Sequence, residues 1–137
     1  MPSVAADSGV LYAAFDSTDR NHHRASGFLA QSRATLVTNL PVLTEVSYML
    51  RKSRETQRGF LKFATNALDI DRDTASDLSR IVEIMAKYED LPADFADASL
   101  VVLCERRGIE EIATLDKDFD VYLLENGRHL RNIFREV

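Results

Sequence analysis

The sequence contains little of what makes a chain fibrous, disordered or covalently stapled. Its 137 residues include only 5 glycines, 3 prolines and 1 cysteine. Few glycines and prolines, together with 45% hydrophobic residues, exclude collagen-like, low-complexity and disordered chains. A single cysteine excludes an internal disulfide and fits a reducing cytoplasm. Because Cys104 follows the apolar run at 100–103, we expect a buried, inert thiol.

The sequence also lacks an excess of positive charge and a long apolar run. The 17 basic and 22 acidic residues give a net charge of −5, which excludes binding to nucleic acid or anionic lipid by non-specific attraction alone. This charge still permits a nuclease whose acidic pocket is neutralised by metal cations. No apolar stretch approaches the ~20 residues of a membrane span, and the N-terminus lacks the basic segment of a signal peptide. We therefore expect one cytoplasmic domain over residues 1–137.

Short apolar runs alternate with amphipathic stretches along the chain. We expect strands at 3–6, 35–38 and 112–115, with brief strands at 69–71 and 130–134. We expect helices at 10–15, 21–31, 39–50, 55–68, 74–88 and 94–107. Strands separated by helices predict an α/β domain whose parallel sheet is covered on both faces.

Capping residues predict where several helices begin or end. Thr18 or Asp19 is the expected N-cap of the helix at 21–31. Pro41 suits the first helical position of the next helix, and Gly108 suits the end of the helix at 94–107.

Four acidic residues lie in apolar surroundings that do not suit a solvated surface. Asp7 and Asp116 each follow a predicted strand, whereas Glu45 and Asp97 lie near the starts of predicted helices. In open α/β sheets, ligands bind beyond the carboxyl ends of the strands. We therefore expect these four side chains to converge at that edge of the sheet.

Converging carboxylates need a countercharge. Two of them ~4 Å apart repel by about 4 kcal/mol at an effective dielectric constant near 20. An oxygen-only set of ligands selects a hard divalent cation, Mg²⁺ or Mn²⁺. Such a site suits phosphodiester hydrolysis, because the metal lowers the pKa of the attacking water and neutralises charge on the phosphate.

Other interpretations of the same residues remain open. Each acid alone can be a helix cap or a surface residue, and Asp94 is the expected N-cap of its helix with Asp97 at the third helical position. A phosphoacceptor receiver domain also binds Mg²⁺ in an acidic pocket, but it needs a pair of acids after its first strand and a lysine after its last strand. In this sequence Asp7 has no acidic neighbour, and the nearby Lys117 directly follows Asp116. Labelling by a small phosphodonor would identify a receiver. A metal titration would separate a nuclease from a non-catalytic binding module on the same fold.

Four segments in order resemble one family. They are VAADSGVL at 4–11, LTEV at 43–46, DFADASL at 94–100 and TLDKDF at 114–119. The chain resembles the PIN-domain ribonucleases and, within them, the VapC-type toxins of toxin–antitoxin pairs. The resemblance implies a three-layer α/β/α sandwich with a central, mostly parallel sheet.

The resemblance also implies a function and a site. It predicts an Mg²⁺-dependent endoribonuclease toxin, with Mn²⁺ as a substitute, that hydrolyses RNA to leave 5′-phosphate and 3′-hydroxyl ends. The implied partners are a small VapB-type antitoxin, which would place a basic side chain among the acids, and a second copy of the chain. In this sequence the implied catalytic residues are Asp7, Glu45, Asp97 and Asp116, with the metal on Asp7 and Asp97, Thr114 supporting the fourth acid and Asp94 as an auxiliary acid.

Basic residues and amphipathic helices supply candidate contact surfaces. Dimerisation is expected through the helix with Phe60, Leu61 and Phe63 or through residues 81–85. Basic residues on solvated helix faces are candidates to guide RNA to the acidic pocket: Arg20, His22, His23, Arg24, Arg51, Lys52, Arg54 and Arg58.

Overall fold

The fold is built on a five-stranded sheet in which neighbouring strands pair in parallel, in the order β3-β2-β1-β4-β5. The computed structural model describes residues 2–91 and 93–137. Its strands are β1 (Ser3–Ala6), β2 (Thr35–Asn39), β3 (Asp69–Asp71), β4 (Glu111–Ala113) and β5 (Arg131–Asn132). Its helices are α1 (Ser8–Phe15), α2 (His22–Gln31), α3 (Leu40–Met49), α4 (Arg54–Ala67), α5 (Leu78–Lys87) and α6 (Phe95–Arg107).

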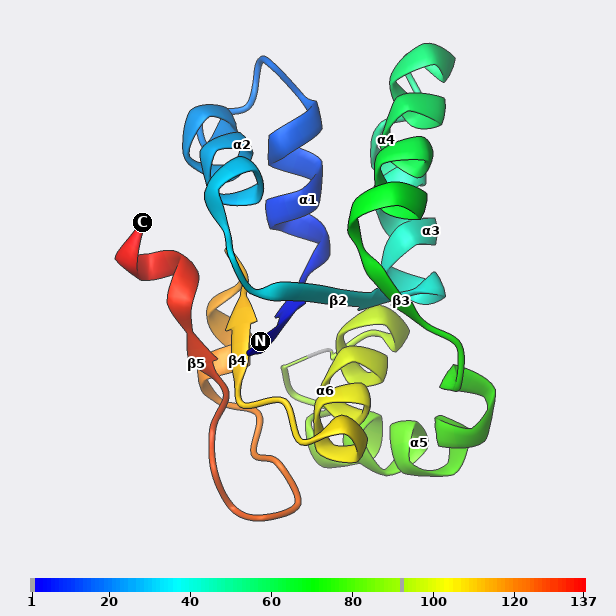
Figure 1. Ribbon diagram of the computed structural model, residues 1–137. Coiled ribbons are helices and arrows are strands. Elements are labelled where there is room, and N and C mark those ends of the chain that lie inside the picture. The colour runs from blue at the N-terminus through cyan, green and yellow to red at the C-terminus, as the bar shows by residue number, and fades with distance from the viewer. Residues whose placement is uncertain (1, 92) are drawn as a thin grey trace.

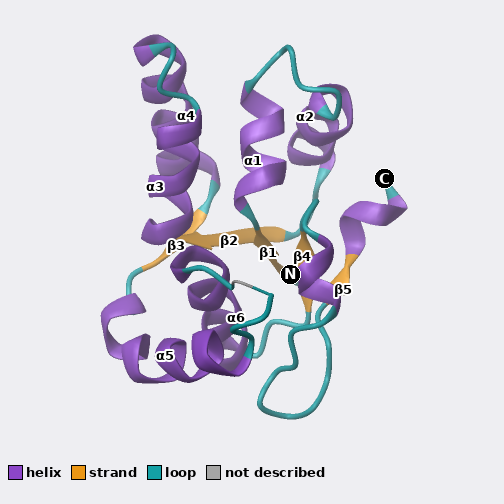
Figure 2. Cartoon of the chain, turned by 180° about the vertical axis from the view of Figure 1, so that it is seen from behind, coloured by secondary structure: helices purple, strands orange, loops and turns teal. Residues whose placement is uncertain are grey.

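The strand order explains why the helices form two layers. The chain adds β2 and then β3 on one side of β1, and it crosses back to add β4 and β5 on the other side. Because parallel crossovers are right-handed, connections that run in opposite directions place their helices on opposite faces. α1 to α4 lie on one side of the sheet and α5 and α6 on the other (Figures 1 and 2). The expected three-layer α/β/α sandwich is confirmed.

Several predicted boundaries were wrong for local reasons. The strand expected at 112–115 ends at Ala113, because the N–H of Thr114 bonds to the side chain of Asn132 instead of a neighbouring strand. The strand expected at 130–134 shortens to β5, because the Asn132 side chain also accepts the N–H of Phe134 and starts a 3₁₀ turn at Ile133–Glu136. The helix expected at 74–88 begins with a 3₁₀ turn, Thr74–Asp77, before α5.

The capping predictions had mixed outcomes. The N-cap of α2 is Asn21, not Thr18 or Asp19, because the Asp19 carboxylate accepts the N–H of Asn21 in the turn before the helix. α3 begins at Leu40, so Pro41 occupies the second helical position instead of the first. Gly108 ends α6 in the left-handed region with φ 67°, as predicted.

α6 is the most buried helix of the sandwich. Its residues from Ala98 to Cys104 are all buried, and a helix that is apolar all round belongs inside a protein. Burial raises the pKa of the Cys104 thiol to about 12, as expected for an inert cysteine. None of the helices in residues 2–91 and 93–137 combines the length and apolar character needed to cross a bilayer.

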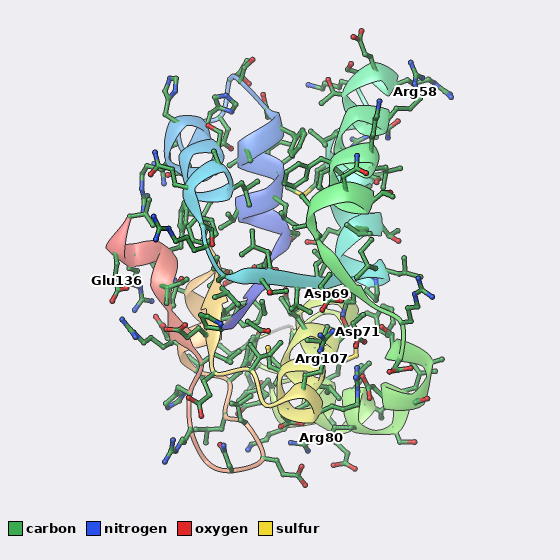
Figure 3. All side chains as sticks on the ribbon, in the orientation of Figure 1. Arg58, Asp69, Asp71, Arg80, Arg107 and Glu136 are labelled. Atoms are coloured by element: carbon green, nitrogen blue, oxygen red, sulfur yellow. The ribbon has the colours of Figure 1, made fainter. Side chains whose placement is uncertain are left out.

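Ion pairs attach the C-terminal half of α6 to its neighbours. Arg106 bonds to both carboxylate oxygens of Asp71 and of Asp77, and these two acids are 4% and 8% exposed. Arg80 of α5 binds Glu105 with two parallel hydrogen bonds of 3.0 and 2.9 Å. Figure 3 shows Arg107 next to Asp69 and Asp71 between β3 and α6. These contacts hold α6 against β3 and α5.

Replacing Arg106 is expected to destabilise the fold strongly. Arg106→Gln leaves the buried Asp77 without its cation and the buried Asp71 with Arg107 at 3.5 Å alone, and breaking such a buried pair costs about 3 kcal/mol or more of unfolding free energy. The matched control is Arg131→Gln, because Arg131 forms two exposed ion pairs worth less than about 1 kcal/mol. Urea unfolding of both variants measures the difference, and equal losses would contradict the structural role of Arg106.

Candidate active site

The predicted acidic residues surround the point where the order of the strands reverses. The connection from β1 leads toward β2, and the connection from β4 leads toward β5 in the opposite direction, so the carboxyl ends of β1 and β4 border the crevice where ligands bind in open α/β sheets. Asp7 directly follows β1, and its N–H donates to the carbonyl of Ala113 at the end of β4. Asp116 lies three residues beyond Ala113 on the same side. The topology therefore brings both strand-end acids to one edge.

Asp7 is held by a threonine from the neighbouring strand. The Thr114 hydroxyl donates to Oδ2 of Asp7 at 2.7 Å and accepts the N–H of Asp116 at 2.9 Å. Thr114 was expected to support Asp116, and it binds the backbone of that residue while its proton goes to Asp7. The other carboxylate oxygen of Asp7, Oδ1, is buried and has no hydrogen-bond partner in the described part of the chain.

Burial makes Asp7 a weaker acid than usual. Its residue is 3% exposed, and burial raises the pKa of its carboxyl from 3.8 to about 6. Burial is the largest cause of this rise in pKa, the negative charges of Asp116 and Glu45 add to it, and the Thr114 hydroxyl and the backbone N–H of Ser8 act against it. A buried carboxylate oxygen without a partner is costly, so the site favours whatever binds that oxygen.

Asp97 shows the strongest electrostatic effect of the group. The pKa of its carboxyl is raised to about 8, first by burial and then by the charges of Asp7, Asp94, Asp116 and Glu45, in that order. All four predicted acids therefore lie close enough to act on one another. The Asp94 carboxylate accepts the N–H of Asp97 at 2.9 Å, which confirms Asp94 as the N-cap of α6.

Glu45 and Asp116 are each held by local hydrogen bonds. The hydroxyl of Ser8, next to Asp7 in the chain, donates to Oε1 of Glu45 in α3 at 2.6 Å. The Asp116 carboxylate accepts the N–H of Asp118 and caps the 3₁₀ turn Lys117–Asp120. Both acids are half-buried, so they form the open side of the site.

The carboxylates share one edge without closing around one point. Within residues 2–91 and 93–137, no three or more histidine, cysteine or acidic side chains are gathered tightly enough to hold a metal ion as they stand. Unneutralised carboxylates repel one another, which keeps such groups apart. The donor set nonetheless suits a hard cation, because it consists of carboxylate oxygens and includes the unpartnered Oδ1 of Asp7.

Comparison with known proteins agrees with this geometry. The family model of the PIN domain matches residues 4–122, which spans both strand ends and all four acids. The chain belongs to the PIN domain family. This membership favours a nuclease site over the receiver-domain alternative.

Individual relatives of this PIN domain come from two bacteria. The chain is 29% identical over 114 residues to Ribonuclease VapC26 of Mycobacterium tuberculosis, covering 81% of this chain and 84% of the relative. Among solved structures, it resembles VapC20 of M. tuberculosis, a toxin that cleaves the sarcin–ricin loop, with a TM-score of 0.79 and 19% identity over 86% of this chain and 93% of that chain. It also resembles VapBC2 of Rickettsia felis, solved with a DNA fragment from its promoter, with a TM-score of 0.62 and 17% identity over 85% of this chain and 90% of that chain. At these identities, the two structures show a shared fold.

A buried polar bridge that the sequence did not predict connects two helices of this PIN domain. Asn39, at the end of β2, accepts the N–H of Val42 and thereby caps α3, which carries Glu45. Its side-chain amide also donates to the hydroxyl of Ser99 in α6 at 3.0 Å. Both residues are at most 1% exposed. Asn39 had a visible capping signal, but its pairing with Ser99, 60 residues away, had none.

Metal-free protein is expected to lose stability as the pH rises from about 5 to 8. The carboxyls of Asp7 and Asp97 have folded-state pKa values raised to about 6 and about 8, so the folded chain binds more protons than the unfolded chain in this window. Unfolding free energy therefore falls with increasing pH. Thermal melting in a chelator measures this fall.

The Asp97→Asn variant is the control for the pH effect. It removes the group with the highest pKa and should melt at a temperature that depends less on pH between 5 and 8. Added Mg²⁺ or Mn²⁺ should stabilise the unmodified chain most at pH 8, where the acids are ionised. Parallel pH profiles for the two proteins would show that Asp97 is not the group that titrates.

The Asn39–Ser99 bridge predicts coupled energetics. Asn39→Ala removes a cap and leaves the Ser99 hydroxyl without its buried partner, at a cost of about 2 kcal/mol. A double-mutant cycle with Ser99→Ala should give a coupling energy of about 1 kcal/mol. Additive losses in urea unfolding would contradict a direct bridge between the two helices.

Proposed function

We propose that this chain is a metal-dependent endoribonuclease that acts on RNA as a single PIN-type domain, 1–137, and serves as the toxin of a toxin–antitoxin pair. The observation that carries the proposal is the electrostatic coupling of Asp7, Glu45, Asp97 and Asp116 at the reversal point of the sheet. Membership of the PIN domain family and the likeness to Ribonuclease VapC26 support it.

Asp7 and Asp97, with Asp116, would hold Mg²⁺ or Mn²⁺. A bound divalent cation lowers the pKa of a water molecule and offsets charge on a phosphate. Thr114 orients Asp7 through Oδ2 and leaves Oδ1 unpartnered in the described structure, which is the arrangement expected of a ligand prepared for a cation. The raised pKa values imply that cation binding displaces protons from Asp7 and Asp97, so activity should increase as the pH rises through this range.

Glu45 is suited to position the attacking water. Its Oε1 accepts a hydrogen bond from the Ser8 hydroxyl at 2.6 Å. This bond fixes the carboxylate and leaves Oε2 to accept a hydrogen bond from water. Attack by this water on the phosphate and departure of the 3′ oxygen would leave 5′-phosphate and 3′-hydroxyl ends. Ser8 thus acts through Glu45, as Thr114 acts through Asp7.

Two protein partners belong to the proposal. The acidic edge and the net charge of −5 suit a basic segment of a small VapB-type antitoxin, and an arginine can bind two carboxylates at once. The VapBC2 structure supports this choice of partner. A homodimer would use the outer face of α5, where Leu78, Val82 and Met85 are exposed. Of the dimer residues expected from the sequence, Phe60, Ile81 and Ile84 are buried in the core and cannot serve.

Substitution of the acids tests the proposed nuclease. Asp7→Asn and Asp97→Asn are each expected to reduce Mg²⁺-dependent RNA cleavage by at least about a hundredfold, since even the supporting partners of metal ligands contribute up to that factor. Without metal, both variants should melt at or above the temperature of the unmodified chain at pH 8, because each removes repulsion.

Glu110→Gln is the matched control, because Glu110 is an exposed acid just before β4, at the opposite edge of the sheet. It should cleave RNA at the rate of the unmodified chain. Full activity of the Asp97→Asn protein would refute the site, and absence of metal-dependent cleavage by the unmodified chain on total cellular RNA would refute the function.

A further inference from the structure

An acidic chain that binds RNA needs local cations to hold the phosphates. A cavity of about 390 Å³ adjoins Asp116 and supplies them. Its walls include Arg24, Lys117 and Arg135, which come from α2, from the turn after Asp116 and from the C-terminal 3₁₀ turn. These three segments are distant in sequence, so the fold itself gathers positive charge next to the acidic edge.

Arg24 is fixed in the cavity with donors to spare. Its guanidinium donates to the carbonyl of Phe134, to the backbone oxygen of Val137 and to the side chain of Asn21, using one hydrogen on each nitrogen. The guanidinium carbon lies 4.6 Å from the centre of the Phe134 ring. Arginine has five N–H donors, so two remain after these contacts. Among residues 2–91 and 93–137, no carboxylate forms an ion pair with Arg24.

The other two cations differ in their pairing. Lys117 is exposed and, like Arg24, makes no ion pair with any acid of the described ranges. Arg135 forms an ion pair with Asp120, which also lines the cavity. Within the described ranges, neither Arg24 nor Lys117 therefore has a paired side-chain carboxylate.

Two residues that line the cavity, Asn132 and Thr114, connect it to the proposed catalytic acid Asp7. Asn132 donates to the carbonyl of Thr114 at 3.0 Å and accepts its N–H at 3.3 Å. Thr114 in turn donates to Asp7 at 2.7 Å. A ligand that contacts Asn132 and Thr114 would thus lie in a defined position relative to Asp7.

We propose that this cavity binds a backbone phosphate of the substrate RNA, adjacent to the phosphate that is cleaved. The proposal rests on the nuclease function above. A planar guanidinium binds phosphate through two parallel hydrogen bonds, and a lysine ammonium adds a point charge. Contacts of this kind position a strand without reading its sequence. Arg24 was among the basic residues expected from the sequence, whereas Lys117 and Arg135 were not.

The experiment compares charge removal in the cavity with charge removal elsewhere. The variants are Arg24→Gln, Lys117→Gln and their double, and Arg33→Gln is the control, because Arg33 is exposed just before β2, at the edge of the sheet opposite the acids. Arg135 is left unchanged to keep Asp120 paired. Each change is made in the Asp97→Asn background, and binding of a short fluorescein-labelled single-stranded RNA of random sequence is measured over a range of salt concentrations.

Each cavity charge removed should reduce the steepness of the log–log salt dependence of binding by about 0.7, and the double variant by about 1.4. The Arg33→Gln control should keep the slope of its parent. In the otherwise unmodified chain, the same changes should raise KM for RNA cleavage more than they lower kcat. Thermal melting shows whether each variant is folded under the assay conditions.

The outcomes separate the cavity from the nuclease function. Cleavage by the parent chain with unchanged salt slopes and KM in the Lys117→Gln and double variants would overturn the cavity while leaving the function intact. Equal loss of slope in Arg33→Gln would also overturn it, because it would indicate a diffuse electrostatic field instead of a local phosphate site. RNA binding with the expected slopes but no cleavage by the parent chain would refute the nuclease instead.

Discussion

Negative charge buried at the carboxyl edge of the sheet is the constraint on which the rest of this structure depends. Asp7 is almost fully enclosed and has one oxygen without a partner, and Asp97 titrates near neutral pH. Such a group is tolerated only when its surroundings hold it in place. The Thr114 hydroxyl does this for Asp7 from the adjacent strand, and the same hydroxyl receives the backbone of Asp116. One threonine therefore couples two of the acids that repel each other.

The elements that carry the other acids are fastened from both ends. The first turn of α6 is capped by Asp94 and joined to β2 through the bridge from Ser99 to Asn39. The far end of the same helix is tied by Arg106 to two buried aspartates. Between these ends the helix is buried all round, so it cannot shift without opening the core. Rigid support of this kind is what keeps mutually repelling carboxylates at one edge.

Charge is distributed so that the acidic edge and its basic neighbour remain separate. Most arginines of the C-terminal half neutralise carboxylates, as Arg106, Arg107 and Arg131 do. Arg24 instead donates hydrogen bonds to backbone oxygens of the C-terminal turn. Within the described ranges, no side-chain carboxylate pairs with its guanidinium beside Asp116. A protein with a net charge of −5 can thus present a small basic patch without binding nucleic acid non-specifically over its whole surface.

Three features could be predicted from the sequence alone. They are the alternation of strands and helices, the four acids at the ends and starts of those elements, and the family. These features depend on local patterns: apolar periodicity, caps such as Asp94 and Gly108, and short motifs around each acid. The sequence misjudged elements whose ends depend on distant partners. β4 stops at Ala113 because of Asn132, and Phe60 and Ile81 turn into the core instead of serving as an outer face.

The side chains that support the acids, and the position of the basic side chains beside them, follow from the tertiary structure and not from local sequence. Thr114 and Asp7 are 107 residues apart in sequence, and Asn39 and Ser99 are 60 apart, so no local pattern pairs them. Burial beside other acids likewise separates Asp7 and Asp97 from Asp71 and Asp77, which are buried against Arg106, because desolvation and neighbouring charge depend on the whole fold around a carboxyl group. Local sequence sets where an acid stands on its strand or helix. The packing of the sheet and its two helical layers sets its neighbours, its proton affinity and therefore its chemistry.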